Sequence, residues 1–226
     1  MANFHRPLND IMNKTIGVLG GDQLGTMLQE AANRLNVKTI TLEKGSDSPS
    51  KQINARSTHV DDAFTDPTAI RQLAEQYDVL TIEIEHVDTE VIEDLSTGTR
   101  TRDDWRLVNG TKVEVQPSWR TIRVIQDKYD QKEYLMKHRL PVARSVPLND
   151  NSISELEELG EEHGYPFMLK SRTEAYNGFA VKDASVLQAA VDMLRNRPLY
   201  SEQWARFNLE LAVMVVKVDN DAAADW

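Results

Sequence analysis

Thr15-Ile-Gly-Val-Leu-Gly-Gly-Asp-Gln-Leu-Gly25 is the stretch of this 226-residue chain that decides its fold class. Its first five residues are a short apolar run that ends at glycines, which is typical of a buried strand. A β-branched strand is expected at Val37–Leu42. Between the two, apolar residues recur at helical spacing, at Leu24, Met27, Leu28, Ala31, Ala32 and Leu35. The strand, glycine turn, helix and strand form a βαβ unit, whose right-handed crossover predicts a parallel sheet.

The same alternation continues to Val115. Asp66-Pro67 is a helix start, with an aspartate N-cap before a proline at the first helical position. A strand at Val79–Ile84, a short helix at Thr89–Leu95 and a strand at Lys112–Val115 follow. These elements predict a doubly wound, Rossmann-like first domain over residues 14–116.

A second domain is expected over residues 117–218, with a loose tail at 219–226. Strands and helices alternate here without the regular βαβ order, which indicates an α+β unit. Ser154-Glu-Leu-Glu157 is interpreted as a capping box that opens a helix reaching His163. The other predicted helices are Trp119–Ile125, Lys128–His138 and Ser185–Leu194. The predicted strands are Phe167–Lys170, Phe179–Lys182, Leu199–Gln203 and Glu210–Val218.

Composition excludes several classes of protein. The chain has 36 acidic and 26 basic residues, a net charge of −10, which argues against broad nucleic-acid binding. It has no cysteine, which excludes disulfides and thiolate metal sites. No apolar run approaches the roughly 20 residues of a membrane span, and Met1–Lys14 does not have the pattern of a secretory signal. A cytoplasmic protein without membrane or nucleic-acid partners is expected.

The glycine turn is in the right context for a dinucleotide fingerprint, between a strand and a helix. However, Asp22 stands at the middle glycine of G-x-G-x-x-G, where backbone must approach a pyrophosphate. Glu43 lies where a ribose-binding acid belongs. We therefore favour a purely structural turn, and an NAD-dependent oxidoreductase stays a weaker alternative. Glu83, Glu85 and His86 cluster at a strand end, but neighbouring strand residues face opposite sides, so no metal site is predicted.

Several motifs occur together and in order along the chain. They are Gly17–Leu28, Ser48–Ile53, Phe64–Pro67, Thr81–Val87, Val113–Arg123, Gln126–Lys128, Gly164–Arg172 and Glu210–Val216. In these motifs the chain resembles the carboxyaminoimidazole ribonucleotide synthetases, in particular the synthetase half of the fungal phosphoribosylaminoimidazole carboxylases. The resemblance runs from Lys14 to Lys217.

The resemblance implies an ATP-grasp architecture, with a Rossmann-like domain followed by a nucleotide clamp that is incomplete in this sequence. It also implies a role in purine biosynthesis, in which Mg²⁺ and ATP phosphorylate bicarbonate. The amine of aminoimidazole ribonucleotide then takes the carboxyl group. Small-molecule partners would be ATP, bicarbonate and the ribonucleotide.

Residues are carried over only where they match the family's motifs. The ATP-binding positions implied are Lys128, Lys170, Tyr176, Gly178, Glu202 and Glu210. The ribonucleotide-binding positions implied are Gln23, Gly25 and Glu85. The catalytic residues stay unassigned, and no metal ligand is matched.

Departures from the family pattern concern the lid and the end of the clamp. The loop Ala175–Phe179 has Asn177 where the family has an acid, and it lacks an Arg-Gly-Asn segment. The magnesium-binding acid and the Asn–Glu pair of the family are not matched. We therefore expect weak or no turnover, and a non-catalytic nucleotide-binding module or degenerate fragment is the alternative. Apolar strand faces around Leu211–Val218 would favour self-association, so a homodimer is also an expectation.

Overall fold

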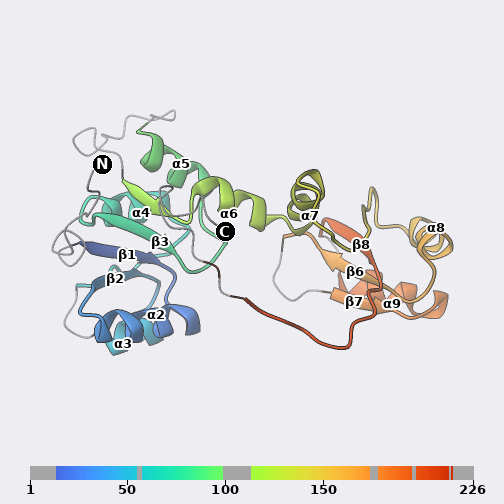
Figure 1. Cartoon of the computed structure of the whole chain (residues 1–226), viewed down its shortest axis with the longest axis horizontal. Coiled ribbons are helices and arrows are strands. Elements are labelled where there is room, and N and C mark those ends of the chain that lie inside the picture. The colour runs from blue at the N-terminus through green and yellow to red at the C-terminus, as the bar shows by residue number, and fades with distance from the viewer. Residues whose placement is uncertain are drawn as a thin grey trace, which may run out of the picture. The chain divides into compact units, whose positions relative to one another are not determined.

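The computed structural model describes residues 14–54, 58–98, 113–173, 178–194, 197–213 and 215 (Figure 1). The chain forms two compact units, residues 1–141 and 142–226. The helical stretches that follow residue 116 therefore group with the first unit by their contacts. The predicted division into 14–116 and 117–218 stays a prediction, and the predicted tail at 219–226 lies outside the described residues.

The first unit is built on a parallel four-stranded sheet, as predicted. Its strands are β1 (Thr15–Leu19), β2 (Lys38–Leu42), β3 (Val79–Ile82) and β4 (Glu114–Gln116), in the order β2-β1-β3-β4. β1 is central, and its last residue, Leu19, is in register with Leu42 on one side and Ile82 on the other. The carboxyl ends of these three strands therefore meet at one edge of the sheet.

Six helices of the described residues accompany this sheet. They are α2 (Gln23–Arg34), α3 (Pro49–Ile53), α4 (Pro67–Ala74), α5 (Thr89–Thr97), α6 (Trp119–Gln126) and α7 (Lys128–Lys137). Asp66 caps α4, as predicted, and its carboxylate accepts from the amides of Thr68 and Ala69. Two details were not predicted correctly. The short helix α3 was not expected, and β3 ends at Ile82 rather than Ile84.

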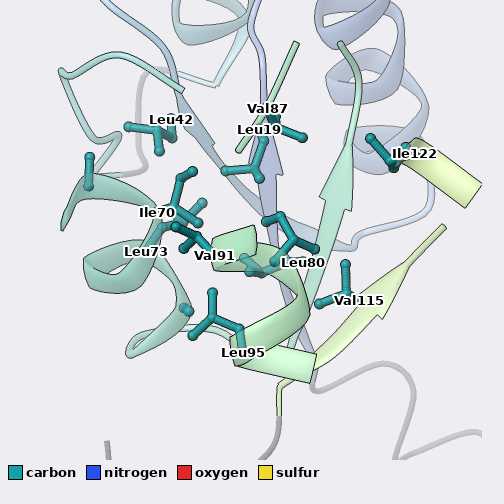
Figure 2. Close-up of a cluster of buried hydrophobic side chains, with 13 residues drawn as sticks. Leu19, Leu42, Ile70, Leu73, Leu80, Val87, Val91, Leu95, Val115 and Ile122 are labelled. Atoms are coloured by element: carbon teal, nitrogen blue, oxygen red, sulfur yellow. The ribbon is translucent and has the colours of Figure 1, made fainter. Parts of the chain in front are cut away.

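A cluster of aliphatic side chains forms the core of the first unit (Figure 2). Leu73 of α4 and Leu80 of β3 lie at its centre and are fully buried. Gly17 permits this packing, because a Cβ at that position would lie 2.8 Å from Leu80 Cδ2 and 3.1 Å from Leu73 Cδ2. The remaining labelled members are Leu19, Leu42, Ile70, Val87, Val91, Leu95, Val115 and Ile122.

The orientation of α2 differs from what its apolar spacing suggests. Leu24, Met27 and Leu35 are 60%, 57% and 66% exposed, while Gln29 is fully buried. Gln29 Nε2 donates to Thr41 Oγ1 at 3.0 Å, and Asn54 Nδ2 donates to Gln29 Oε1 at 3.3 Å. The inner face of α2 is thus a satisfied polar network rather than an apolar stripe.

The second unit has an antiparallel sheet covered by helices. Its strands are β5 (Ser145–Pro147), β6 (Phe167–Ser171), β7 (Gly178–Val181) and β8 (Leu199–Gln203), in the order β5-β8-β6-β7. The helices are α8 (Ile153–His163), the 3₁₀ turn η1 (Ala184–Val186) and α9 (Leu187–Met193). Leu156, Phe167, Leu169, Leu187 and Leu199 form part of its core. This arrangement confirms the α+β prediction.

The predicted capping box at Ser154 and Glu157 is wrong by two residues. Ser152 is the N-cap of α8, and its hydroxyl accepts from the amide of Glu155 at 3.2 Å. The carboxylate of Glu155 accepts from the backbone amides of Asn149, Asp150 and Asn151. These bonds satisfy the turn before the helix and fix its start at Ile153.

The predicted strand at 210–218 is wrong for the residues of it that the structure describes. Residues 204–213 and 215 belong to no strand, and no described strand lies alongside to complete a ladder of hydrogen bonds. Phe207, Leu209, Leu211, Val213 and Val215 are between 65% and 83% exposed. In the described part of the chain, no helix is both long and apolar enough to cross a bilayer.

Two histidines, the half-buried His59 and the buried His163, have pKa values lowered from the ordinary one. The amide of Thr41 donates to His59 Nδ1 at 3.1 Å, so the ring proton is at Nε2, which lies 2.9 Å from the Asn54 carbonyl. Burial lowers the pKa of His59, and the charge of Lys51 lowers it further. Burial and the charge of Arg144 lower the pKa of His163, whose Nε2 lies 3.1 Å from Ser201 Oγ.

We expect acid to destabilise the fold through these two rings. Their pKa values are lower when folded than the ordinary 6.5, so the unfolded chain takes up protons first. The stability that the two histidines contribute is complete at pH values above the ordinary histidine pKa of 6.5, and it is lost as the pH falls through their lowered pKa values. Urea unfolding at about pH 7.5 and about pH 5.5 tests this, with His59→Gln and His163→Gln each reducing the difference. An unchanged pH dependence in the double variant would contradict the assignment.

Candidate functional site

The glycine turn joins β1 to α2 at the carboxyl edge of the parallel sheet. Gly20 has a φ of +103°, and a side chain there would collide with the carboxylate of Glu83. A Cβ at Gly21 would lie 2.6 Å from Ser48 Oγ, and a Cβ at Gly25 would lie 3.1 Å from the Gly20 carbonyl. Each glycine therefore has a local packing reason, which supports the structural interpretation of this turn.

Carboxylates surround the turn. The amide of Gly21 donates to Glu43 Oε2 at 3.1 Å. Burial raises the pKa of Glu83, the amide of Gly25 opposes this, and the charges of Asp22 and Glu43 raise the pKa further. Glu83 Oε2 is buried and has no hydrogen-bond partner among the described residues. A pyrophosphate would meet three acids here, which weighs against a dinucleotide.

The connection from β3 to α5 lies against this turn. The amide of Glu83 donates to the Leu19 carbonyl at 2.9 Å, which ties the start of the connection to the end of β1. Glu85 follows, with its Oε1 3.7 Å from His86 Nε2. The structure thus brings the turn that holds Gln23 and Gly25 and the connection that holds Glu85 to the same edge of the sheet. Open parallel sheets bind ligands at this edge.

Lys128 lies in the first unit, as the first residue of α7. Asp127 is the N-cap of that helix, and its carboxylate accepts from the amides of Tyr129 and Asp130 at 2.9 and 3.0 Å. Lys128 is half-buried. The other matched ATP positions belong to the second unit.

In the second unit, Lys170 and Glu202 form an ion pair with Nζ and Oε2 3.1 Å apart. They lie on the adjacent strands β6 and β8, whose register pairs Met168 with Glu202 and Lys170 with Tyr200. Gly178 of β7 is paired with Lys170 of the neighbouring strand β6, and a Cβ at Gly178 would lie 3.3 Å from Lys170 Cγ. The missing side chain leaves room for the lysine stem.

Two further matched ATP positions have no described contact with this pair. Tyr176 lies outside the described residues. Glu210 is exposed and belongs to no helix or strand, and within the described structure Lys170 pairs with Glu202 instead. The assignment of these residues to ATP stays a prediction.

Two residues that contribute contacts to the candidate site were not identified from the sequence. Glu83 was noted only as a weak metal candidate, yet its carboxylate packs directly on the turn. No local pattern signals this contact, because Gly20 and Glu83 follow strands β1 and β3, which are neighbours in the sheet but far apart in the sequence. Gln126 lies in a matched motif, but its bonds to the β3–α5 connection span 39 and 41 residues. No group of three or more His, Cys, Asp or Glu side chains able to hold a metal occurs among the described residues.

Two family models match the chain. Residues 12–104 match the ribonucleotide synthetase preATP-grasp domain, and residues 133–226 match the ATP-grasp domain. Together they span both compact units. The matches agree with a parallel sheet in the first unit and an antiparallel sheet in the second.

Curated relatives are similar over nearly the whole chain. Phosphoribosylaminoimidazole carboxylase of Ogataea methanolica is 49% identical over 208 residues, which are 91% of this chain and 36% of the relative. The enzyme of that name from Saccharomyces cerevisiae is 47% identical over 211 residues, covering 92% of this chain and 35% of the relative. The chain thus spans about a third of the length of these relatives.

Solved structures show the same fold. Carboxyaminoimidazole ribonucleotide synthase from Aspergillus clavatus, complexed with ATP, is 43% identical with a TM-score of 0.77, covering 87% of this chain and 48% of that one. A second structure from that organism, in complex with ADP and 5-aminoimidazole ribonucleotide, has a TM-score of 0.75. It covers 86% of this chain and 47% of its own.

We expect Gly20→Ala to destabilise the first unit by about 2–4 kcal/mol, because it adds a collision with Glu83 to the strain of a positive φ. Gly45→Ala is the matched control, since Gly45 has a φ of +95° and its Cβ would approach only the exposed Asp47. The control should cost about 1 kcal/mol. Urea denaturation measures both. Equal losses in the two variants would show that Glu83 does not crowd the turn.

Proposed function

The chain belongs to the ATP-grasp family of carboxyaminoimidazole ribonucleotide synthetases, and from this premise we propose that it binds ATP and aminoimidazole ribonucleotide for purine biosynthesis. The proposed reaction is the ATP-dependent carboxylation of the ribonucleotide's amine by bicarbonate. The chain spans only part of the length of its relatives, so the activity, substrates and partners of those relatives are proposed for this chain.

The observation that carries the nucleotide proposal is the Lys170–Glu202 pair. The two residues match the family's ATP positions and are 32 apart in sequence, yet the sheet places their charged atoms 3.1 Å apart. Side chains of Lys170 and Glu202 are 30% and 13% exposed, so the pair is only partly shielded from water. An ammonium group in that position can exchange its carboxylate for a phosphate oxygen.

The glycine turn and Glu85 supply the proposed ribonucleotide site in the first unit. Gly25 lies in the first turn of α2, where backbone amides and the helix dipole favour a phosphate. The carboxylates around the turn oppose this attraction, and the raised pKa of Glu83 favours its neutral form more than that of an ordinary glutamate. Glu85 is placed on the adjoining connection, where its carboxylate can accept from ribose hydroxyls. Lys128, in the first unit, is proposed as an ATP contact from the family resemblance alone.

Magnesium is implied by the family, but the described residues do not form a site for it. No cluster of three or more potential ligands is present in that part of the chain, and we assign no step to the metal. The roles proposed for the described residues are limited to binding and orienting the two substrates. A cytoplasmic location is part of the proposal, as for other soluble enzymes of nucleotide synthesis.

We expect titration calorimetry to detect ATP binding to the full chain, with Lys170→Ala weakening it about tenfold or more because a charge-assisted bond to phosphate is lost. Lys182→Ala is the matched control, since Lys182 is an exposed lysine just after β7. Absence of ATP binding by the unmodified chain would overturn the proposal. ADP release that depends on both bicarbonate and the ribonucleotide tests turnover. Binding of ATP without turnover would instead mark a nucleotide-binding module.

We also propose that the exposed apolar side chains of residues 207–215 bring two copies of the chain together. Apolar residues alternate along this segment, which favours pairing as a strand. Light scattering after size exclusion should show a dimer that Leu211→Lys with Val213→Lys converts to monomer. Arg206→Lys is the control, as a neighbouring exposed position that keeps its charge. A monomer in the unmodified chain would contradict the proposal.

A further inference from the structure

Gln126 makes an unusual pair of hydrogen bonds. It is the last residue of α6, and its side-chain Nε2 donates to the backbone carbonyls of Glu85 and Val87, at 2.7 and 2.8 Å. Both carbonyls belong to the connection between β3 and α5. One amide group therefore holds two points of a segment that lies about 40 residues earlier in the chain.

The connection is also fixed at its two ends, and Val87 packs into the core of the first unit. At its start, the Glu83 amide donates to the Leu19 carbonyl at 2.9 Å. At its end, Asp88 caps α5 and accepts from the amides of Glu90 and Val91 at 2.9 and 3.2 Å. Glu85 lies between these anchors. Because a backbone carbonyl shielded from water needs a donor, the Gln126 amide stabilises the conformation that presents Glu85.

Gln126 is itself held on a rigid helix. Ile122 of α6 is 2% exposed. The Arg123 guanidinium donates to Thr89 Oγ1 at 3.2 Å and to Glu93 Oε2 at 2.9 Å, which ties α6 to α5. Arg123 also stacks 4.5 Å from the Trp119 ring. The position of the Gln126 amide is therefore set before any ligand binds.

On its other side, Gln126 adjoins the start of α7. Asp127 ends α6 with an extended backbone (φ −117°, ψ 110°) and is the N-cap of α7. Lys128 follows as the first residue of α7. Gln126 thus lies between Glu85, a proposed ribonucleotide contact, and Lys128, a proposed ATP contact, and all three belong to the first unit.

We propose that Gln126 is a positioning residue that holds Glu85 in place for the ribonucleotide and links that subsite to the start of α7. The inference rests on the proposed function and assigns Gln126 a role that acts through Glu85 rather than through a substrate contact of its own. The link acts through the two hydrogen bonds to the Glu85 and Val87 carbonyls. Loss of those bonds should loosen the connection and leave the rest of the first unit intact.

Two variants of nearly the same size test the proposal in the full chain. Gln126→Met removes both donors. Gln126→Glu places a carboxylate against the two carbonyls, and a protonated acid can donate only one bond. Gln72→Met, at an exposed position of α4, is the matched control. Backbone hydrogen exchange over residues 84–88 reports on the connection without any ligand, and calorimetry measures binding of aminoimidazole ribonucleotide and of ATP.

We expect faster exchange over residues 84–88 in both Gln126 variants, and ribonucleotide affinity about tenfold lower or more in Gln126→Met. ATP affinity measured without the ribonucleotide should fall less. The deficit of Gln126→Glu should be smaller at about pH 5.5 than at about pH 7.5, when protonation restores a donor.

Two outcomes would overturn the proposal. Ribonucleotide affinity in Gln126→Met equal to that of the unmodified chain would remove the positioning role, and faster exchange in the same variant would then mark Gln126 as a purely structural link. If the unmodified chain binds no ribonucleotide, the proposed function itself fails, and the positioning role fails with it. The unmodified chain therefore separates the two kinds of failure.

Discussion

The candidate site of the first unit depends on the close approach of two backbone segments at Gly20. A residue without a side chain and with a positive φ lets the end of β1 turn into α2 while the Glu83 carboxylate lies directly against it. The neighbouring hydrogen bond from the Glu83 amide to Leu19 fixes the distance between the segments. Glu43, which accepts from the Gly21 amide, and the connection that holds Glu85 lie at the same edge of the sheet as this contact.

The two units present their polar residues in different ways. In the first unit, acids and backbone amides gather where the parallel strands end. Gln126 of α6 donates to the connection that holds Glu85, and Arg123 ties α6 to α5. In the second, Lys170 and Glu202 lie on adjacent antiparallel strands, and a glycine on the next strand makes room for the lysine. Rigid strands position side chains more precisely than loops do, which suits a site that must hold charged groups.

Much of the fold followed from the sequence because local patterns determine it. The strands up to Ile82 and the helix that starts at Pro67 have strong apolar and capping signals. Patterns failed where a distant partner decides the outcome. The apolar residues of α2 predicted a helix correctly but not the face it buries, because Gln29 finds hydroxyl partners on β2. Residues 210–213 belong to an apolar stretch that predicted a strand, yet a strand requires a neighbour for its hydrogen bonds. For the candidate site, Lys170 and Gly178 were recognisable only through the family resemblance, and the long-range contacts of Gln126 were not recognisable at all.

The Lys170–Glu202 pair has a consequence for how fast an anionic nucleotide can reach the second unit. A lysine already neutralised by a carboxylate projects little field into solution, and the chain as a whole carries a charge of −10. Long-range attraction therefore contributes little to the encounter of a nucleotide with the second unit. Added salt should screen the repulsion between the anionic nucleotide and the negatively charged chain rather than an attraction. If Lys170 binds ATP as proposed, capture depends on an exchange of partners at contact distance, in which a phosphate oxygen displaces Glu202 from the ammonium group.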